Sequence, residues 1–196
     1  CEGLVGSEMC IRDSDKILTD PRWDLKFIGM QIIIEGLALA AFQMLKQLSK
    51  DPLLTQLLHY VIRDEARHVT FGINYLEDFV KTLTDEEREE RAEFAFEACV
   101  ISRERLINTR AMQKYLKMSE DEAREFTLQT SANNTFRNFL FSRVIPNLSR
   151  IGLLTDNVRP KFDELGLLEF EHAPDDFECD WNELEKPLEN FDEISS

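Results

Sequence analysis

Three residues, Glu35, Glu65 and His68, have the types and the spacing of metal ligands. Glu35 lies in the middle of the apolar run FIGMQIIIEGLALAAFQML, residues 27–45, where a carboxylate is costly unless it is paired or binds a cation. Glu65 and His68 are three residues apart, so a helix places both side chains on one face. Carboxylate and imidazole groups ligate metal ions, and these residues therefore predict a metal site.

The apolar periodicity predicts the two helices that carry these residues. Residues 23–48 form one mostly apolar run, and residues 53–83 keep a helical period after Pro52, which suits the first turn of a helix. In each helix the acidic or imidazole side chains replace apolar residues of the stripe that faces a bundle core. The two stripes are Ile28, Ile32, Glu35, Leu39 and Phe42, and Leu54, Leu58, Val61, Glu65, His68, Gly72, Leu76 and Phe79.

The length of the two helices predicts that Glu35 and Glu65 meet. The turn between the helices centres near Lys50, with Glu35 fifteen residues before it and Glu65 fifteen residues after it. At about 1.5 Å per residue, each carboxylate lies ~22 Å from the turn of an antiparallel hairpin. We therefore expect the two side chains to face each other at the same height.

Two interpretations of this cluster stay open, a metal site and a buried Glu–His ion pair without metal. Glu35 and Glu65 would repel each other, and each would raise the pKa of the other unless a cation lay between them. A metal ion removes that conflict, so the metal site is the favoured interpretation.

The rest of the chain also predicts helices. Two capping boxes, TDEE from residue 84 and SEDE from residue 119, indicate helices over residues 84–117 and 119–144. The second of these is expected to stop near Pro146. No stretch alternates apolar and polar residues as a half-buried strand does, and the predicted fold class is all-α.

The formal net charge of −15 is unevenly distributed. Residues 163–196 carry −12, residues 15–162 carry −1 and residues 1–14 carry −2. We therefore expect a helical domain over residues 15–162 and an acidic-aromatic tail over residues 163–196, which packs on the bundle or docks into a partner. The acidity excludes binding to nucleic acid, which requires Lys and Arg on the surface.

Residues 1–14, CEGLVGSEMCIRDS, are left out of the fold prediction. The stretch VGSEMCIRDS resembles a translated sequencing-adaptor read-through, and a genuine N-terminal arm is the alternative. We expect the natural sequence to begin near Asp15 and to be truncated upstream of it.

The cysteines predict where in the cell the protein is located, and the apolar run bears on whether it spans a membrane. The four scattered cysteines match no zinc pattern and indicate free thiols in a cytoplasmic protein. The run around Glu35 is long enough to span a membrane, but an ionisable residue at the bilayer centre costs ~3 kcal/mol or more. We expect no membrane span.

The string IRDEARHV, residues 62–69, resembles the metal-ligand helix of ribonucleotide reductase small subunits and related ferritin-like di-iron carboxylate proteins. The upstream string IIIEGLALAAF resembles their preceding helix, which supplies a lone glutamate. The similarity covers residues 23–79. It implies the C-terminal portion of a ferritin-like helical bundle, with the second metal-ligand hairpin followed by further long helices.

The resemblance implies a role for each residue of the motif. Glu35 would be a carboxylate ligand, Glu65 would bridge two irons, and His68 would ligate one of them. Asp64 would hydrogen-bond a histidine on another helix and hold its orientation. The cofactor would be two iron ions, or manganese and iron, with the remaining ligands supplied by a missing N-terminal part.

The resemblance also implies a function. Leu39 and Val61 would line the apolar pocket in which dioxygen meets the metal ions. The protein would be an oxidoreductase or oxygenase that activates dioxygen and acts on a small organic substrate with an electron donor. The p-aminobenzoate N-oxygenases are a related option, but they carry an additional histidine where this chain has Val61.

Four alternatives stay open beside this function. The chain could belong to a ribonucleotide reductase small subunit-like protein, in which the acidic tail would dock a larger subunit. It could be a non-catalytic ferritin-like iron-binding protein, or a metal-free helical interaction protein. Finally, a homodimer could share one metal site between two half-bundles.

Overall fold

A computed structural model describes residues 21–107, 109–129 and 131–173. Helices make up its regular secondary structure, and these residues contain no β-strand. The predicted all-α fold class is therefore confirmed. Residues 1–14 and most of the predicted acidic-aromatic tail lie outside the described residues.

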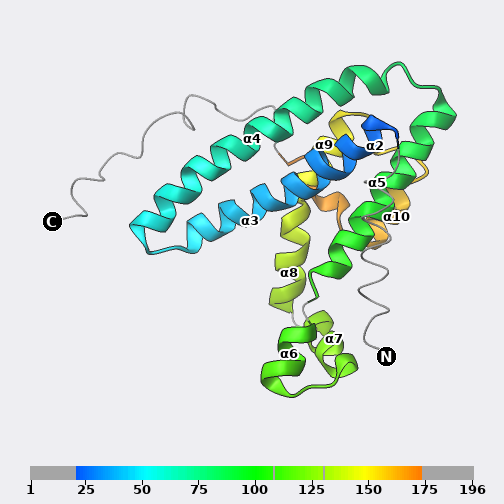
Figure 1. Cartoon of the computed structure of the whole chain (residues 1–196). Coiled ribbons are helices and arrows are strands. Elements are labelled where there is room, and N and C mark those ends of the chain that lie inside the picture. Colours follow the sequence, from blue (N-terminus) through cyan, green and yellow to red (C-terminus); the bar gives the residue numbers. More distant parts are fainter. Residues whose placement is uncertain (1–20, 108, 130, 174–196) are drawn as a thin grey trace.

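The predicted helical hairpin is present. A continuous helical run consists of α2 (Trp23–Phe27), the π-helix η2 (Ile28–Ile34) and α3 (Glu35–Leu48), and α4 (Pro52–Val80) returns beside it (Figure 1). The turn ends where the Asp51 side chain accepts hydrogen bonds from the backbone N–H groups of Leu53 and Leu54. Pro52 occupies the first turn of α4, where a missing N–H costs nothing.

The main core lies between this hairpin and α5 (Asp85–Arg105), and α9 (Val144–Arg150) also contributes to it. The core side chains are aliphatic or small, which lets the helices approach closely. Its members include Ile28, Ile32, Ile33, Val69, Ile73, Leu76, Ala92, Ala95, Cys99, Val144, Ile145 and Leu148. A smaller cluster of Leu39, Leu58, Ile62 and Ala66 fills the hairpin toward its turn.

The helix predicted over residues 84–117 is divided. The predicted capping box is confirmed, because the Thr84 hydroxyl accepts from the Glu87 N–H and the Glu87 carboxylate accepts from the Thr84 N–H. However, α5 ends at Arg105, and α6 (Thr109–Leu116) follows as a separate helix. The intervening Ile107 is buried, so tertiary packing interrupts a pattern that looks continuous in the sequence.

The helix predicted over residues 119–144 is also divided. The second capping box, Ser119 with Glu122, is confirmed. The region consists of α7 (Glu120–Gln129), α8 (Ser131–Phe139) and the 3₁₀ turn η3 (Leu140–Ser142), followed by α9. Pro146 does not end a helix as predicted, because it lies in the first turn of α9, where its missing N–H is tolerated.

The packed body continues past the expected boundary at residue 162. Beyond α10 (Arg159–Glu164), Leu167 is fully buried in the main core, and the 3₁₀ turn η4 (Leu168–Phe170) packs against it. Gly166 makes the intervening turn with a φ of 68°, a conformation that favours glycine.

One helical run, Trp23–Leu48, is long and apolar enough to cross a membrane. Its most apolar window has a mean hydropathy of 1.7, and 44% of that window is buried inside the protein. The core helix of a soluble protein has the same length and composition, so this run is weak evidence for a membrane span. The expected absence of a span stays a prediction.

Candidate metal centre

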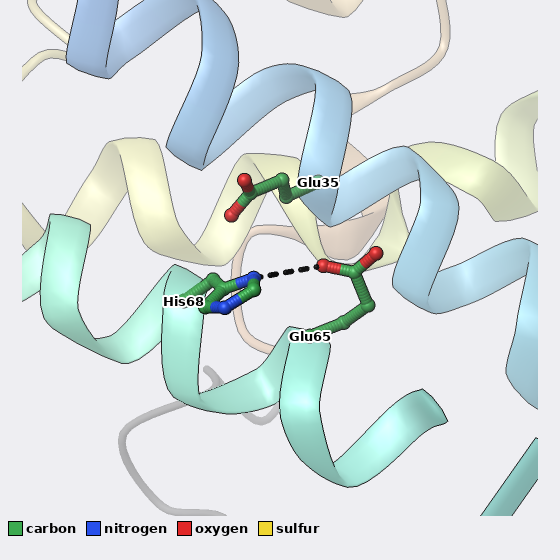
Figure 2. Close-up of side chains that lie close together, drawn as sticks. All are labelled: Glu35, Glu65 and His68. Carbon is green, nitrogen blue, oxygen red and sulfur yellow. Dashed lines mark hydrogen bonds and ion pairs between the residues drawn. The ribbon is translucent and has the colours of Figure 1, made fainter. Parts of the chain in front are cut away.

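The structure brings Glu35, Glu65 and His68 together, as the hairpin spacing predicts. Each residue offers one ligand atom, and these atoms all lie within 4.8 Å of one another (Figure 2). Glu35 begins α3, whereas Glu65 and His68 project from α4. The His68 Nδ1 lies 3.3 Å from the Glu65 Oε2, one helical turn away. Their proximity is therefore confirmed, and metal binding by them stays a prediction.

The π-helix η2 sets the position of Glu35. It ends at Ile34, so Glu35 is the first residue of the α-helical segment that follows. A π-helix has wider turns than an α-helix and occurs frequently at functional sites. The sequence does not predict this π-helix. The apolar residues around Glu35 are compatible with a π-helix and with an α-helix, so their pattern does not distinguish the two.

The Glu35 carboxylate is poorly compensated by its surroundings. Its Oε2 atom is buried and has no hydrogen-bond partner. Burial raises the pKa of Glu35, and the nearby charge of Glu65 raises it further. The charge of His68 and a hydrogen bond from Gln31 act in the opposite direction on this pKa. The site thus holds a buried oxygen and two close carboxylates, both of which a cation would stabilise.

Gln31 is a site residue that the ligand pattern in the sequence does not predict. It lies on η2, one turn before Glu35, and hydrogen-bonds that carboxylate. The signal for it in the sequence is a polar residue inside an apolar run, four positions before the glutamate. Gly72 on α4 lies against Gln31, since a Cβ added at Gly72 would be 2.6 Å from the Gln31 Cβ.

The predicted stripe of α4 is only partly confirmed, because Leu58, Gly72 and Leu76 are buried whereas His68 is exposed. The Glu65 side chain is 26% exposed and that of His68 is 61% exposed, so the pair lies at the edge of the buried face. The buried face is formed by Leu58, Ile62, Ala66, Val69, Ile73, Leu76 and Val80, together with Gly72 and His59. The sequence pattern allows either set of positions to face the core, and the packing of α4 against α3 and η2 selects the observed one.

Asp64 lies outside the cluster. Its side chain is 57% exposed, and its Oδ1 accepts hydrogen bonds from Arg63 Nε at 3.2 Å and Arg67 Nη1 at 3.4 Å. These partners belong to the same helix and are not histidines. The expected hydrogen bond to a histidine of another helix is therefore not present among the described residues.

Leu39 and Val61 lie near the cluster along the chain. Leu39 is fully buried and packs with Leu58, Ile62 and Ala66, whereas Val61 is half-buried. The contact of these residues with dioxygen stays a prediction.

The residues of the cluster fit an iron or manganese ion. Two carboxylates and one imidazole form an oxygen-rich donor set of the kind that these ions prefer. The buried, unpartnered Oε2 of Glu35 is the structural observation that favours a cation over the metal-free ion pair. In the part of the chain that the structure describes, this is the one group of three or more such side chains close enough to share an ion.

Comparisons with family models, with curated proteins and with solved structures found no match to this chain.

Proposed function

We propose that this chain forms part of a non-haem di-iron, or manganese–iron, oxidoreductase with a ferritin-like bundle. The observation that supports the proposal is the convergence of Glu35, Glu65 and His68 within 4.8 Å, with a buried carboxylate oxygen that lacks a partner. The enzyme would act on a small organic substrate with dioxygen and an electron donor.

Each residue of the cluster has a distinct part in this function. Glu35 and Glu65 would hold the metal through carboxylate oxygens, and His68 would bind it through an imidazole nitrogen. Iron held by these residues would supply the chemistry that activates dioxygen. Gln31 would position Glu35 by its hydrogen bond, and the buried residues Ile32 and Leu39 lie one turn before and one turn after Glu35.

The three ligands would hold one divalent ion. Ligands for a second ion would have to come from outside the described residues, because this part of the chain has no further cluster. The exposed side of His68 leaves room for them, since its side chain is 61% exposed. The chain alone should therefore bind a single Fe²⁺ or Mn²⁺ ion, with lower affinity than a complete site.

Metal analysis of the purified chain tests the proposal. The chain is incubated with Fe²⁺ without oxygen, separated by gel filtration and analysed for bound iron by mass spectrometry. We expect bound iron in the wild type and its loss in Glu35→Ala, Glu65→Ala and His68→Ala. Glu86→Ala, which removes an exposed acid of α5 outside the cluster, should bind iron like the wild type.

Equal iron in all five proteins would overturn the assignment of these ligands. No iron in any of them would favour the metal-free helical protein. Oxygen consumption by the iron-loaded wild type, absent in Glu65→Ala, would test the proposed oxidoreductase chemistry separately.

A further inference from the structure

A cavity of about 360 Å³ lies between the first helical run and α5. None of the three residues of the metal cluster lines it. Its volume falls within the range of about 300–1,000 Å³ typical of small-molecule sites. The cavity therefore has the size of a ligand site that is separate from the metal centre.

The floor of this cavity is apolar. Leu25, Gly29 and Ile33 contribute from α2 and η2, and Phe94, Ala98 and Ile101 contribute from α5. Leu25 and Ile33 are almost fully buried, so the inner wall is part of the main core and is held rigidly. Gly29 adds no side chain, which leaves room between the two helices. A ligand in this space would bury an apolar body.

Of the ionisable side chains that line the cavity, Arg22, Glu90, Glu93 and Arg105 have interaction partners, and Glu97 is the exception. Arg22 donates to Glu90 at 2.7 Å, and Lys161 donates to Glu93 at 2.6 Å. Glu97 is exposed at the rim and makes no hydrogen bond or ion pair within the part of the chain that the structure describes. Its carboxylate is therefore available to a ligand.

We propose that this cavity binds a small organic cation, with its apolar body on the floor and its ammonium or amidinium group on Glu97. A charge-assisted hydrogen bond to a carboxylate is about twice as strong as a neutral one, which sets the orientation of the ligand. An organic anion would be disfavoured, because the lining carries three carboxylates, Glu90, Glu93 and Glu97. The two cations of the lining, Arg22 and Arg105, already have interaction partners. This inference does not depend on the metal cluster.

Three probes with one apolar body and different head groups test the charge preference. They are 4-phenylbutylamine, 4-phenylbutanol and 4-phenylbutyrate, and their binding to the whole chain at neutral pH is measured by titration calorimetry. We expect the amine to bind about tenfold more tightly than the alcohol, and the carboxylate to bind most weakly. Equal binding of amine and carboxylate, or no binding of the amine at millimolar concentration, would overturn the proposal.

Variants locate the site. Glu97→Gln should reduce the affinity for the amine about tenfold and leave that for the alcohol unchanged, whereas Glu86→Gln on the same helix should change neither. Gly29→Leu should block all three probes by filling the cavity. Should this variant fail to fold, Ser102→Phe at the rim serves the same purpose. Unchanged amine binding in Glu97→Gln would refute the role of this residue.

The metal-site variant Glu65→Ala distinguishes the two proposals. It should keep the full affinity for the amine, because Glu65 does not line the cavity. A chain that binds no iron and still binds the amine would therefore contradict the proposed function alone.

Discussion

Gln31 of η2 packs directly on Gly72 of α4, so closely that a Cβ at Gly72 would lie 2.6 Å from the Gln31 Cβ and 3.3 Å from its Cγ. Real side chains do not approach to 2.6 Å, and only glycine allows this contact. The contact brings α4 against the π-helical segment and fixes the side chain that hydrogen-bonds Glu35. The geometry of the candidate metal centre therefore depends on a glycine one turn beyond His68.

Gly72→Ala should destabilise the protein. Alanine is favoured over glycine in a helix by about 1 kcal/mol, but overpacking against Gln31 costs about 1–3 kcal/mol. We expect a net loss of about 1 kcal/mol in the free energy of unfolding, measured in urea.

Gly36→Ala is the matched control, because it also adds one methyl group to a helical glycine. Its Cβ would lie 3.2 Å from the Cγ2 methyl of Val144 and 3.8 Å from the Cα and N atoms of that residue, so a shift of a few tenths of an ångström would accommodate it. This variant should be closer to the wild type in stability. Equal stability of both variants would contradict the role given to Gly72.

Glu35→Gln should stabilise the metal-free protein at neutral pH. Burial and the charge of Glu65 raise the pKa of the Glu35 carboxyl in the folded state, so its ionised form opposes folding. Replacing it with a neutral amide should add about 1 kcal/mol to the free energy of unfolding at pH 7.

The pH dependence of this gain follows from linkage. The gain should disappear as the pH falls below the unfolded-state pKa of 4.5, where the wild-type carboxyl is protonated in both states. Thermal unfolding of the wild type and of Glu35→Gln, from pH 7 to below pH 4.5, measures this difference in stability. With iron present the order should reverse, because the ion stabilises only the wild type. A destabilised metal-free variant at pH 7 would contradict the prediction.

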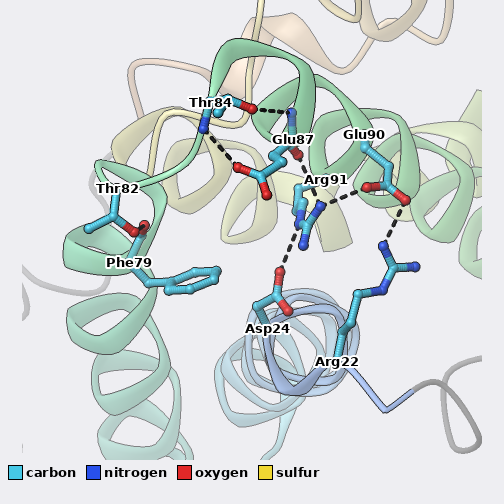
Figure 3. A network of polar contacts seen from close by, with 8 residues as sticks. All are labelled: Arg22, Asp24, Phe79, Thr82, Thr84, Glu87, Glu90 and Arg91. Carbon is cyan, nitrogen blue, oxygen red and sulfur yellow. Dashed lines mark hydrogen bonds and ion pairs between the residues drawn. The ribbon is translucent and has the colours of Figure 1, made fainter.

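A buried ion pair joins the start of the hairpin to α5. The Asp24 Oδ2 accepts from the Arg91 Nε at 2.8 Å, and both side chains are less than 10% exposed (Figure 3). Removing one partner leaves an uncompensated buried charge, which costs about 3–5 kcal/mol. Arg91→Met should lose this amount in urea unfolding.

The double variant Asp24→Leu, Arg91→Met should recover most of that loss, because no charge then remains buried. Arg88→Met, which removes the exposed partner of Asp85, should cost less than about 1 kcal/mol. A double variant no more stable than Arg91→Met would refute the explanation by charge burial.

Glu171 should stabilise the protein in a pH-dependent way. Arg159 donates two hydrogen bonds to its carboxylate, both 2.6 Å long, and these lower the pKa of Glu171. A carboxyl with a lowered folded-state pKa contributes stability above the unfolded value of 4.5 and loses it as the pH falls through the folded-state pKa.

We therefore expect Glu171→Gln to cost about 1 kcal/mol at pH 7 and much less at about pH 3. Thermal unfolding at the two pH values provides the measurement. Glu169→Gln, an exposed acid two residues earlier in the chain, should cost little at either pH. A cost for Glu171→Gln that does not change with pH would exclude the charged hydrogen bonds as its cause.

The sequence by itself determined the local structure. The Asp51–Pro52 start of α4 and the capping boxes at Thr84 and Ser119 are formed by residues only a few positions apart, so the chain specifies them without the rest of the fold. The hairpin spacing also determined that Glu35 and Glu65 come to the same height, because the rise of a helix is constant.

The tertiary structure alone decided the features that depend on distant residues. Three features depend on how α4 lies against α3 and η2. They are the packing of Gly72 on Gln31, the π-helical turn before Glu35 and the edge position of His68. Apolar periodicity does not show which of two neighbouring sets of helix positions faces the core. It also does not show where a long helix is interrupted, as at the buried residue Ile107. Both are decided by the fit of side chains across helices, which no single segment of sequence contains.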